Sequence, residues 1–216
     1  KLLEADDSGD EMGQFVNALT TNLTAFFRES HHFDHLADVL QSLAGHPINI
    51  WSAGCSTGEE AYSIAMTVLE NLEDRDAGRV TITATDLDSS VVEHGCLGIY
   101  DEKRLSGVPY ALKKRYFLKG RGRNAGKARV KEPLRRMVSF DALNLLHEWP
   151  FEEHFQIVFC RNTVIYFSKE LQAELFERLH HFTVPGAWLY IGHSESLWKV
   201  TERFSSHGRT IYQRVD

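Results

Sequence analysis

A short stretch of this sequence combines a glycine-containing turn with a carboxylate at the end of the next hydrophobic run. INIWSA (48–53) has the pattern of a buried strand, GCSTG follows it, and a helical pattern starts at Glu59. A strand, a turn and a helix N-terminus in this order are typical of a nucleotide-type site, because exposed N–H groups and a close backbone approach receive the ligand. Asp86 ends the next strand, where an acidic side chain can accept both hydroxyls of a ribose. Together these features predict a ribose-bearing cofactor.

The residues of the turn discriminate between cofactor classes. A dinucleotide fingerprint that starts at Gly54 needs glycine at positions 56 and 59, where Ser56 and Glu59 stand instead. Glu59 and Glu60 would also repel a pyrophosphate at the helix N-terminus. A cofactor that has no phosphate but carries an ammonium group fits better, and S-adenosylmethionine is such a molecule. The two carboxylates therefore argue against NAD and against a nicotinamide-dependent oxidoreductase.

Other reactive side chains give weaker signals. His31 and His35 are four residues apart on a predicted helix, a spacing that can bind a metal ion, but no third ligand is apparent and we predict no metal. The three cysteines, Cys55, Cys96 and Cys160, are too few and too scattered for a disulfide framework or a zinc site. Cys160 belongs to a predicted buried strand, where a thiol is more often a small apolar filler than a nucleophile.

The elements that must position these residues alternate between strands and helices. This α/β alternation predicts a mainly parallel sheet with helices on both faces. A helix or a pair of helices over about 11–28 precedes it. The expected strands are 48–53, 80–86, 136–143, 155–160, 187–192 and a final one in RTIYQRV, and the further expected helices are 31–43, 59–72, 89–97 and 168–182.

Charge is distributed unevenly along the chain. The net charge is −6, yet the segment from Lys103 to Arg136 holds thirteen Lys and Arg residues and one acidic residue, Glu132. Glycines between its short runs suggest a small antiparallel insertion. Unless it is only a solvated loop, such a segment attracts nucleic acid, an anionic membrane surface or an acidic protein. Nucleic acid is the weakest of these options, because few aromatic side chains interleave with the basic ones.

The composition is that of an ordinary globular protein. The 216 residues suffice for one domain with a full core, and 43% hydrophobic residues, with 13 Phe and 4 Trp, exclude a disordered protein. No uncharged apolar run approaches the length of a membrane span, and the acidic start KLLEADDSGDE lacks the apolar core of a secretion signal. We therefore expect a cytoplasmic protein without membrane insertion. The sequence says nothing firm about the oligomeric state, and a monomer is the default expectation.

Six motifs, spread over essentially the whole chain, carry a specific resemblance. They are TTNLTAFFR (20–28), WSAGCSTGEEAYSIA (51–65), ATDLD (84–88), FDALNLL (140–146), FCRNTVIYF (159–167) and GHSESL (192–197). With these motifs the chain resembles the CheR family, the glutamate methyltransferases of chemotaxis receptors. The resemblance implies a Rossmann-like, S-adenosylmethionine-dependent methyltransferase fold. Its expected parts are a helical segment at 1–45, the remnant of a helical domain, and the methyltransferase domain at 46–216, with the basic β subdomain inserted at about 103–136.

The resemblance also implies two catalytic residues. Arg28 is expected to align the site and balance its charge, and Tyr166 is expected near the transferred methyl group. Considered without the resemblance, Arg28 is a solvated cation at a helix end and Tyr166 a core aromatic residue with a satisfied hydroxyl.

The cofactor contacts implied by the resemblance come from every motif but the last. Glu60, or its neighbour Glu59, is expected at the methionine part and Asp86 at the ribose. Arg161 is expected to close the site. The full set of expected cofactor-binding residues is Asn22, Thr24, Arg28, Gly54, Glu60, Asp86, Asn144, Leu145, Cys160 and Arg161, with Asn144 and Leu145 at the adenine. The loop Gly192–Glu195 is expected to shape the acceptor cleft.

The implied reaction is methyl transfer from S-adenosylmethionine to glutamate side chains of chemoreceptors, with S-adenosylhomocysteine as the product. The implied partners are the acidic cytoplasmic helices of these transmembrane receptors, which the basic segment would attract. In some relatives the β subdomain also binds a C-terminal receptor peptide by adding a strand. A module that holds the cofactor or its product as a signal, without turnover, is the alternative.

Two features depart from the family pattern. Similar proteins usually carry a further N-terminal helical stretch, often basic, and the chain, which begins at Lys1, starts after it. Ala61 replaces the proline that is common after GEE, and we expect this change to be harmless in the first turn of a helix.

Overall fold

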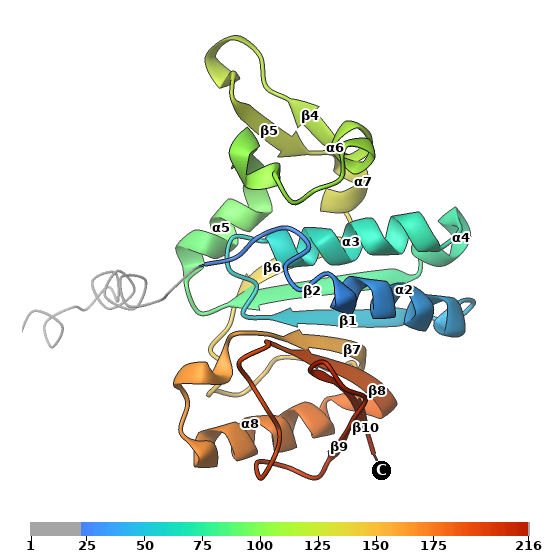
Figure 1. Ribbon diagram of the computed structural model, residues 1–216, viewed down its shortest axis with the longest axis vertical. Coiled ribbons are helices and arrows are strands. Elements are labelled where there is room, and N and C mark those ends of the chain that lie inside the picture. The colour runs from blue at the N-terminus through green and yellow to red at the C-terminus, as the bar shows by residue number, and fades with distance from the viewer. Residues whose placement is uncertain (1–22, 216) are drawn as a thin grey trace, which may run out of the picture.

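The computed structural model describes residues 23–215 of the protein, and its main element is a seven-stranded sheet (Figure 1). The strand order is β6-β2-β1-β7-β8-β10-β9. The first five strands of this order are parallel, and β10 pairs antiparallel with both of its neighbours. The predicted mainly parallel sheet is confirmed. The strands are β1 (Ile48–Ala53), β2 (Val80–Asp86), β6 (Val138–Ala142), β7 (Phe155–Cys160), β8 (Thr183–Ile191), β9 (Phe204–Ser206) and β10 (Ile211–Arg214).

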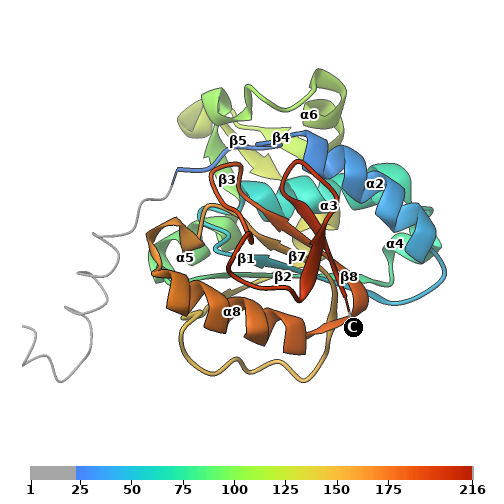
Figure 2. The ribbon, with the colours of Figure 1, turned by 60° about the horizontal axis from the view of Figure 1, so that its bottom comes forward.

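Helices cover both faces of the sheet, as the alternation in the sequence predicts (Figure 2). On one face α2 (His31–Leu43) and α3 (Glu59–Asn71) share an apolar cluster with Ile50 of β1. On the other face α8 (Lys169–His181) shares a second cluster with Trp51. Successive residues of a strand point to opposite sides, so the neighbours in β1 supply one cluster each.

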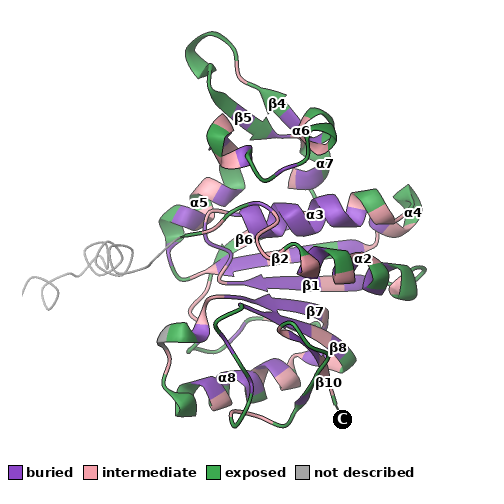
Figure 3. Cartoon of the chain, in the orientation of Figure 1, coloured by how far each residue is buried: buried purple, intermediate pink, exposed green. Residues whose placement is uncertain are grey.

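A small second sheet forms its own layer at one end of the molecule (Figure 1). Its strands β3 (Ile99–Asp101), β4 (Phe117–Lys119) and β5 (Lys127–Val130) pair antiparallel in the order β3-β5-β4. The predicted antiparallel insertion is thus present, although its first strand begins before Lys103. Its outer end is exposed, and its buried residues lie toward α3 and α5 (Figure 3).

Short helices complete the fold. They are α4 (Asp74–Ala77), α5 (Ser89–Leu97), α6 (Tyr110–Tyr116) and α7 (Glu132–Arg135), with the 3-10 turns η2 (Glu102–Leu105), η3 (Gly122–Asn124) and η4 (Val164–Tyr166). None of the helices within residues 23–215 has the length and apolar character that a membrane crossing needs. The division of the chain at residue 45 stays a prediction.

Two expected elements differ from the structure. The helix or pair of helices expected over 11–28 lies mostly outside the described residues, and its described end, 23–28, is irregular, with a turn at 26–27. Phe27 and Glu29 have φ values of 53° and 58°, a left-handed conformation that a right-handed helix cannot contain. β8 begins at Thr183, before the expected 187, because a register irregularity against β7 accommodates the Pro-Gly pair near its start.

Candidate functional site

A cavity of about 400 Å³ opens at the carboxyl ends of β1, β2, β6 and β7. The chain builds β1, β2 and β6 toward one edge of the sheet and then crosses to place β7 on the other side of β1. Such a switch in strand order leaves a crevice at the strand ends, which is where ligands bind in α/β sheets. The cavity therefore lies where the topology of the sheet predicts a ligand site.

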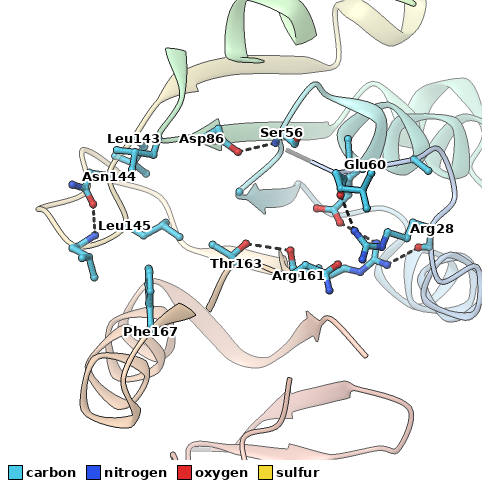
Figure 4. A pocket seen from close by; sticks show the side chains of 17 residues that line it. Arg28, Ser56, Glu60, Asp86, Leu143, Asn144, Leu145, Arg161, Thr163 and Phe167 are labelled. Carbon is cyan, nitrogen blue, oxygen red and sulfur yellow. Dashed lines mark hydrogen bonds and ion pairs between the residues drawn. The ribbon is translucent and has the colours of Figure 1, made fainter. Parts of the chain in front are cut away.

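Most of the residues expected to bind the cofactor surround this cavity (Figure 4). The N-terminal segment contributes Thr24 and Arg28, the ends of β1 and β2 contribute Gly54 and Asp86, and the first turn of α3 contributes Glu60. The later strand ends contribute Asn144, Leu145 and Arg161. Asn22 and the side chain of Tyr166 lie outside the described part of the structure, so their roles stay predictions.

Gly54 is required by the geometry of the turn after β1. Its φ is +81°, and a Cβ there would lie 2.4 Å from Oγ1 of Thr163, which belongs to the loop after β7. The turn does not present its first amides to a ligand, however. The N–H groups of Gly54 and Cys55 donate to the carbonyl of Thr85 at 2.8 and 2.9 Å. The expectation that exposed N–H groups receive the ligand is therefore wrong for these two residues, whose amides hold the turn against β2.

Asp86 is fixed at the end of β2 by the same turn. Its Oδ2 accepts the backbone N–H of Ser56 at 2.8 Å, and its Oδ1 accepts that of Asp88 at 3.1 Å. Burial raises the pKa of Asp86, while these two hydrogen bonds oppose the rise. Each carboxylate oxygen has a second lone pair. The geometry thus leaves the carboxylate able to accept hydroxyl groups from a ligand in the cavity.

Glu60 and Arg161 form a buried ion pair on the cavity wall. Arg161 Nη1 donates to Glu60 Oε2 at 3.0 Å, and the hydroxyl of Ser52 donates to Glu60 Oε1 at 2.7 Å. Burial raises the pKa of Glu60, and the Arg161 guanidinium and the Ser52 hydroxyl oppose this rise. Glu59, the alternative in the sequence, is turned away and pairs with Arg104 of η2. Of the two neighbouring glutamates, only Glu60 lines the cavity.

Two phenylalanines hold the segment that carries Arg28. The ring of Phe26 packs edge-on against Tyr100 and Phe117 of the small sheet, with ring centroids 5.1 and 5.5 Å apart. The backbone N–H of Phe27 donates to the hydroxyl of Ser63 in α3 at 3.0 Å. The carbonyl of Arg28 in turn accepts a hydrogen bond from Arg161 Nη2 at 2.5 Å. The end of the TTNLTAFFR motif is thereby fixed over the cavity.

The opposite end of the cavity is apolar. Leu143, Leu145 and Phe167 lie there, while Asp86 lies between them and the Glu60–Arg161 pair (Figure 4). The side chain of Asn144 accepts the backbone N–H of Leu146 at 2.9 Å and so braces the loop after β6. Sequence reasoning missed Phe167 and Thr163 as cavity residues, although both belong to the FCRNTVIYF motif.

Cys160 does not line the cavity, and its expected role in cofactor binding stays a prediction. It ends β7 with its side chain fully buried in the cluster beneath α8, together with Trp51 and Val158. Alternation along β7 directs Cys160 into this cluster and Phe159 into the cluster on the other face of the sheet, so neither side chain reaches the cavity. Burial raises the pKa of the thiol, which fits the inert apolar filler that the sequence also indicated.

Glu195 connects two strand ends beside the cavity. Its side chain is buried and accepts three backbone N–H groups, those of Asn162, Val164 and Gly192, at 2.9, 3.0 and 2.5 Å. The first two lie in the loop after β7, and the third follows β8. The GHSESL motif therefore fixes the loop that carries Arg161 and Thr163. Its predicted role in shaping an acceptor cleft stays a prediction.

Comparisons with known proteins match nearly the whole chain. The family model for CheR methyltransferase, SAM binding domain, matches residues 22–213. The chain is 47% identical over 210 residues to chemotaxis protein methyltransferase 2 of Pseudomonas aeruginosa, covering 96% of this chain and 75% of the relative. It is 41% identical over 212 residues to the chemotaxis protein methyltransferase of Escherichia coli, covering 98% and 73%.

Solved structures with a similar arrangement include methyltransferases at low sequence identity. PKMT2 from Rickettsia typhi in complex with AdoHcy has a TM-score of 0.43 and 16% identity, covering 72% of this chain and 24% of that chain. The DszA carbon methyltransferase has a TM-score of 0.46 and 19% identity, covering 88% and 40%.

Proposed function

The chain belongs to the CheR methyltransferase family, and from this premise we propose that it methylates glutamate side chains of chemoreceptors. It is an S-adenosylmethionine-dependent methyltransferase of chemotaxis. The observation that carries the proposal is the order of groups along the cavity: an ion pair, then a carboxylate, then an apolar wall. The same order of a charged amino-acid part, a ribose and an adenine occurs along the cofactor.

The residues of the cavity have separate roles in this proposal. Glu60 binds the ammonium of the methionine part, because a buried carboxylate with a further lone pair on each oxygen can accept hydrogen bonds from its N–H groups. Asp86 accepts the two ribose hydroxyls. Leu145 packs against the adenine, beside Asn144. Arg161 holds Glu60 in place and closes the site through its hydrogen bond to the carbonyl of Arg28.

The chemistry requires positioning rather than proton transfer. A glutamate side chain has a pKa of about 4.3 in water, so the acceptor is already ionised at neutral pH and needs no general base. The bound cofactor supplies the methyl group from its sulfonium. The chain aligns the acceptor carboxylate with that methyl group and excludes water from it. In our proposal Arg28 aligns and charge-balances the carboxylate, and Tyr166 orients the acceptor or the methyl group.

The small sheet is the proposed recognition element for the receptor. Nine basic side chains on this sheet and on the segments that adjoin it are exposed, namely Lys103, Lys114, Arg115, Lys119, Arg121, Arg123, Lys127, Arg129 and Arg136. They complement the acidic cytoplasmic helices that chemoreceptors present for methylation, so the reaction would take place in the cytoplasm. Strand addition by a C-terminal receptor peptide at this sheet, and action as a monomer, also belong to the proposal.

Calorimetric titration with S-adenosylhomocysteine, with NADH as the control ligand, tests the cavity directly. We expect micromolar binding of the first ligand alone. Asp86→Asn should weaken it by about tenfold or more, since the amide can keep the hydrogen bond from Ser56, but its N–H₂ group accepts neither the N–H of Asp88 nor a ribose hydroxyl. Asp141→Asn, at an exposed position of β6, is the matched control. Binding of NADH, or an unchanged affinity in Asp86→Asn, would contradict these roles.

Methyl transfer distinguishes the enzyme from its alternative. A receptor cytoplasmic fragment incubated with the protein and radiolabelled S-adenosylmethionine should gain base-labile label, because glutamate methyl esters hydrolyse in base. A protein that binds the cofactor tightly but labels no receptor fragment would be the non-catalytic signalling module.

A further inference from the structure

Three potential metal ligands gather at the start of α2, beside the cofactor cavity but not on its wall. One ligand atom each from Glu29, His31 and His32 lies within 4.8 Å of the others. Glu29 follows Arg28 in the segment over the cavity, and the two histidines open the helix. The cluster is therefore rigidly placed by elements that the methyltransferase site already uses.

Both histidine rings are oriented by one backbone carbonyl. Nε2 of His31 lies 2.9 Å from the carbonyl oxygen of Arg209, and Nε2 of His32 lies 3.2 Å from the same atom. A carbonyl only accepts, so Nε2 carries the proton in each neutral ring and Nδ1 keeps a free lone pair. A hydrogen bond of this kind, from the second ring nitrogen to a carbonyl, is the usual support of a metal-binding histidine.

Two atoms of the cluster face each other without a hydrogen-bond partner among the described residues. His32 is fully buried, and its Nδ1 lies 3.8 Å from Oε2 of Glu29. In the neutral ring the Nε2 proton points to the carbonyl of Arg209, so the lone pair of Nδ1 faces that of Glu29 Oε2. A water molecule that donates to both atoms would hold them about 4.5 Å apart. Two bonds of about 2.1 Å to one metal ion reach at most about 4.2 Å, so the observed separation of 3.8 Å is short enough for a shared metal ion.

The surrounding charges also favour a cation. The guanidinium of Arg161 lies 3.5 Å from Glu29 and 3.0 Å from Glu60, so one buried positive charge serves two carboxylates. His193 reaches the other oxygen of Glu29 at 3.1 Å from an exposed position. One guanidinium against two carboxylates leaves one negative charge, which a further cation beside Glu29 would balance.

We propose that Glu29 Oε2, His31 Nδ1 and His32 Nδ1 bind a divalent transition-metal ion, with solvent at the remaining position. Two imidazoles and one carboxylate are a ligand set that suits zinc. The sequence suggested a different pair, His31 and His35, and no metal. In the structure Nδ1 of His35 instead lies 2.9 Å from the hydroxyl of Tyr190, and the adjacent pair with Glu29 replaces it. The proposal does not depend on the identity of the methyl acceptor.

Zinc titration of the untagged, chelator-treated protein tests the site, with a chromogenic chelator as competitor. We expect one ion per chain with micromolar affinity, and a loss of about tenfold or more in both His31→Gln and Glu29→Gln. Two controls remove an imidazole elsewhere: His35→Gln on the same helix, and His46→Gln at an exposed loop position. Both variants should bind zinc with the affinity of the parent protein. Absence of saturable binding, or equal loss in the two controls, would overturn the proposal.

Nitrogen NMR of the histidine rings tests the ligand atoms without relying on variants. The spectra of the metal-free protein should show the Nε2–H form for His31 and His32, and zinc should shift their Nδ1 signals specifically. Zinc-induced shifts confined to other histidines would assign the ion to a different place and overturn the proposal. Circular dichroism of Glu29→Gln and His31→Gln establishes that a lost affinity is not lost folding.

Discussion

Arg161 Nη1 lies 3.0 Å from Glu60 Oε2, and this ion pair joins the loop after β7 to the first turn of α3 across the end of β1. Both side chains are almost completely buried, with 2% and 11% of their surfaces exposed. The pair therefore shapes the cavity from both sides of the strand-order switch. Its burial also determines what happens when one partner is removed.

Arg161→Met should strongly destabilise the protein. Removing one member of a buried pair leaves the other charge uncompensated, at a cost of about 3–5 kcal/mol in the free energy of unfolding. Adding Glu60→Gln should recover part of this loss, because the neutral amide no longer needs a cation. Urea unfolding measures the free energy of unfolding of the single and the double variant.

The control is Arg203→Met, which breaks the exposed pair with Glu177 and should cost no more than about 1 kcal/mol in the free energy of unfolding. Equal losses in Arg161→Met and Arg203→Met would contradict this account.

Cofactor affinity should increase with pH in the acidic range. Burial raises the pKa of Glu60 above its ordinary value of 4.5, so the free site stays protonated at a pH where an exposed glutamate is ionised. Binding of an ammonium requires the ionised form, and affinity therefore rises as the pH passes upward through the raised pKa. Titrations with S-adenosylhomocysteine at a series of pH values from about 4.5 upward measure this slope. Glu60→Gln should bind more weakly and with a smaller slope, and an equal slope in that variant would exclude Glu60 as its source.

The periodic parts of the fold were predictable from the sequence. The strand INIWSA and the helix from His31 to Leu43 were expected at their observed bounds, because strong hydrophobic patterns dictate which face is buried. The irregular segment 23–28 was not, since apolar residues at helical spacing do not reveal the left-handed conformation of Phe27. Its phenylalanines serve tertiary contacts with the small sheet instead of one helix face.

The site was predictable where a motif places a residue at a strand end. Asp86 and Glu60 line the cavity because β2 stops and α3 starts there. The direction of a side chain was harder to predict. Glu59 and Glu60 are neighbours in one helical turn, yet one pairs with Arg104 and the other with Arg161. Cys160 shows the same limit on a strand, because alternation along β7 directs its side chain into the cluster beneath α8 instead of the cavity.

Glu195 should act as a positioning residue for the cofactor loop. Glu195→Gln replaces one acceptor oxygen by an N–H₂ group, which opposes at least one of the three backbone donors it now faces. The unfolding free energy should fall by about 1–3 kcal/mol. A merely structural role would leave the affinity of the folded protein unchanged. We instead expect weaker binding of S-adenosylhomocysteine at a temperature where the variant is fully folded.

The control for this variant is Glu202→Gln, an exposed position in the same loop region. It should leave both the stability and the affinity of the parent protein intact. Thermal unfolding and calorimetry on the two variants separate the effects. Loss of stability without any change in affinity would restrict Glu195 to a role in the fold.

Receptor association should depend steeply on ionic strength. Arg121 and Arg123 lie at the exposed tip between β4 and β5, where the surrounding side chains are mostly basic. An acidic receptor surface would be attracted to this tip before contact, which speeds association at low salt and is screened at high salt. Arg121→Glu should slow association and flatten its salt dependence, as measured by stopped-flow kinetics with a receptor fragment.

The control is Arg75→Glu, on exposed α4, which makes the same charge change outside the small sheet and should have a smaller effect. Association rates that are equal at low and high salt would exclude electrostatic attraction, and equal effects of the two variants would assign it to net charge instead of to the small sheet.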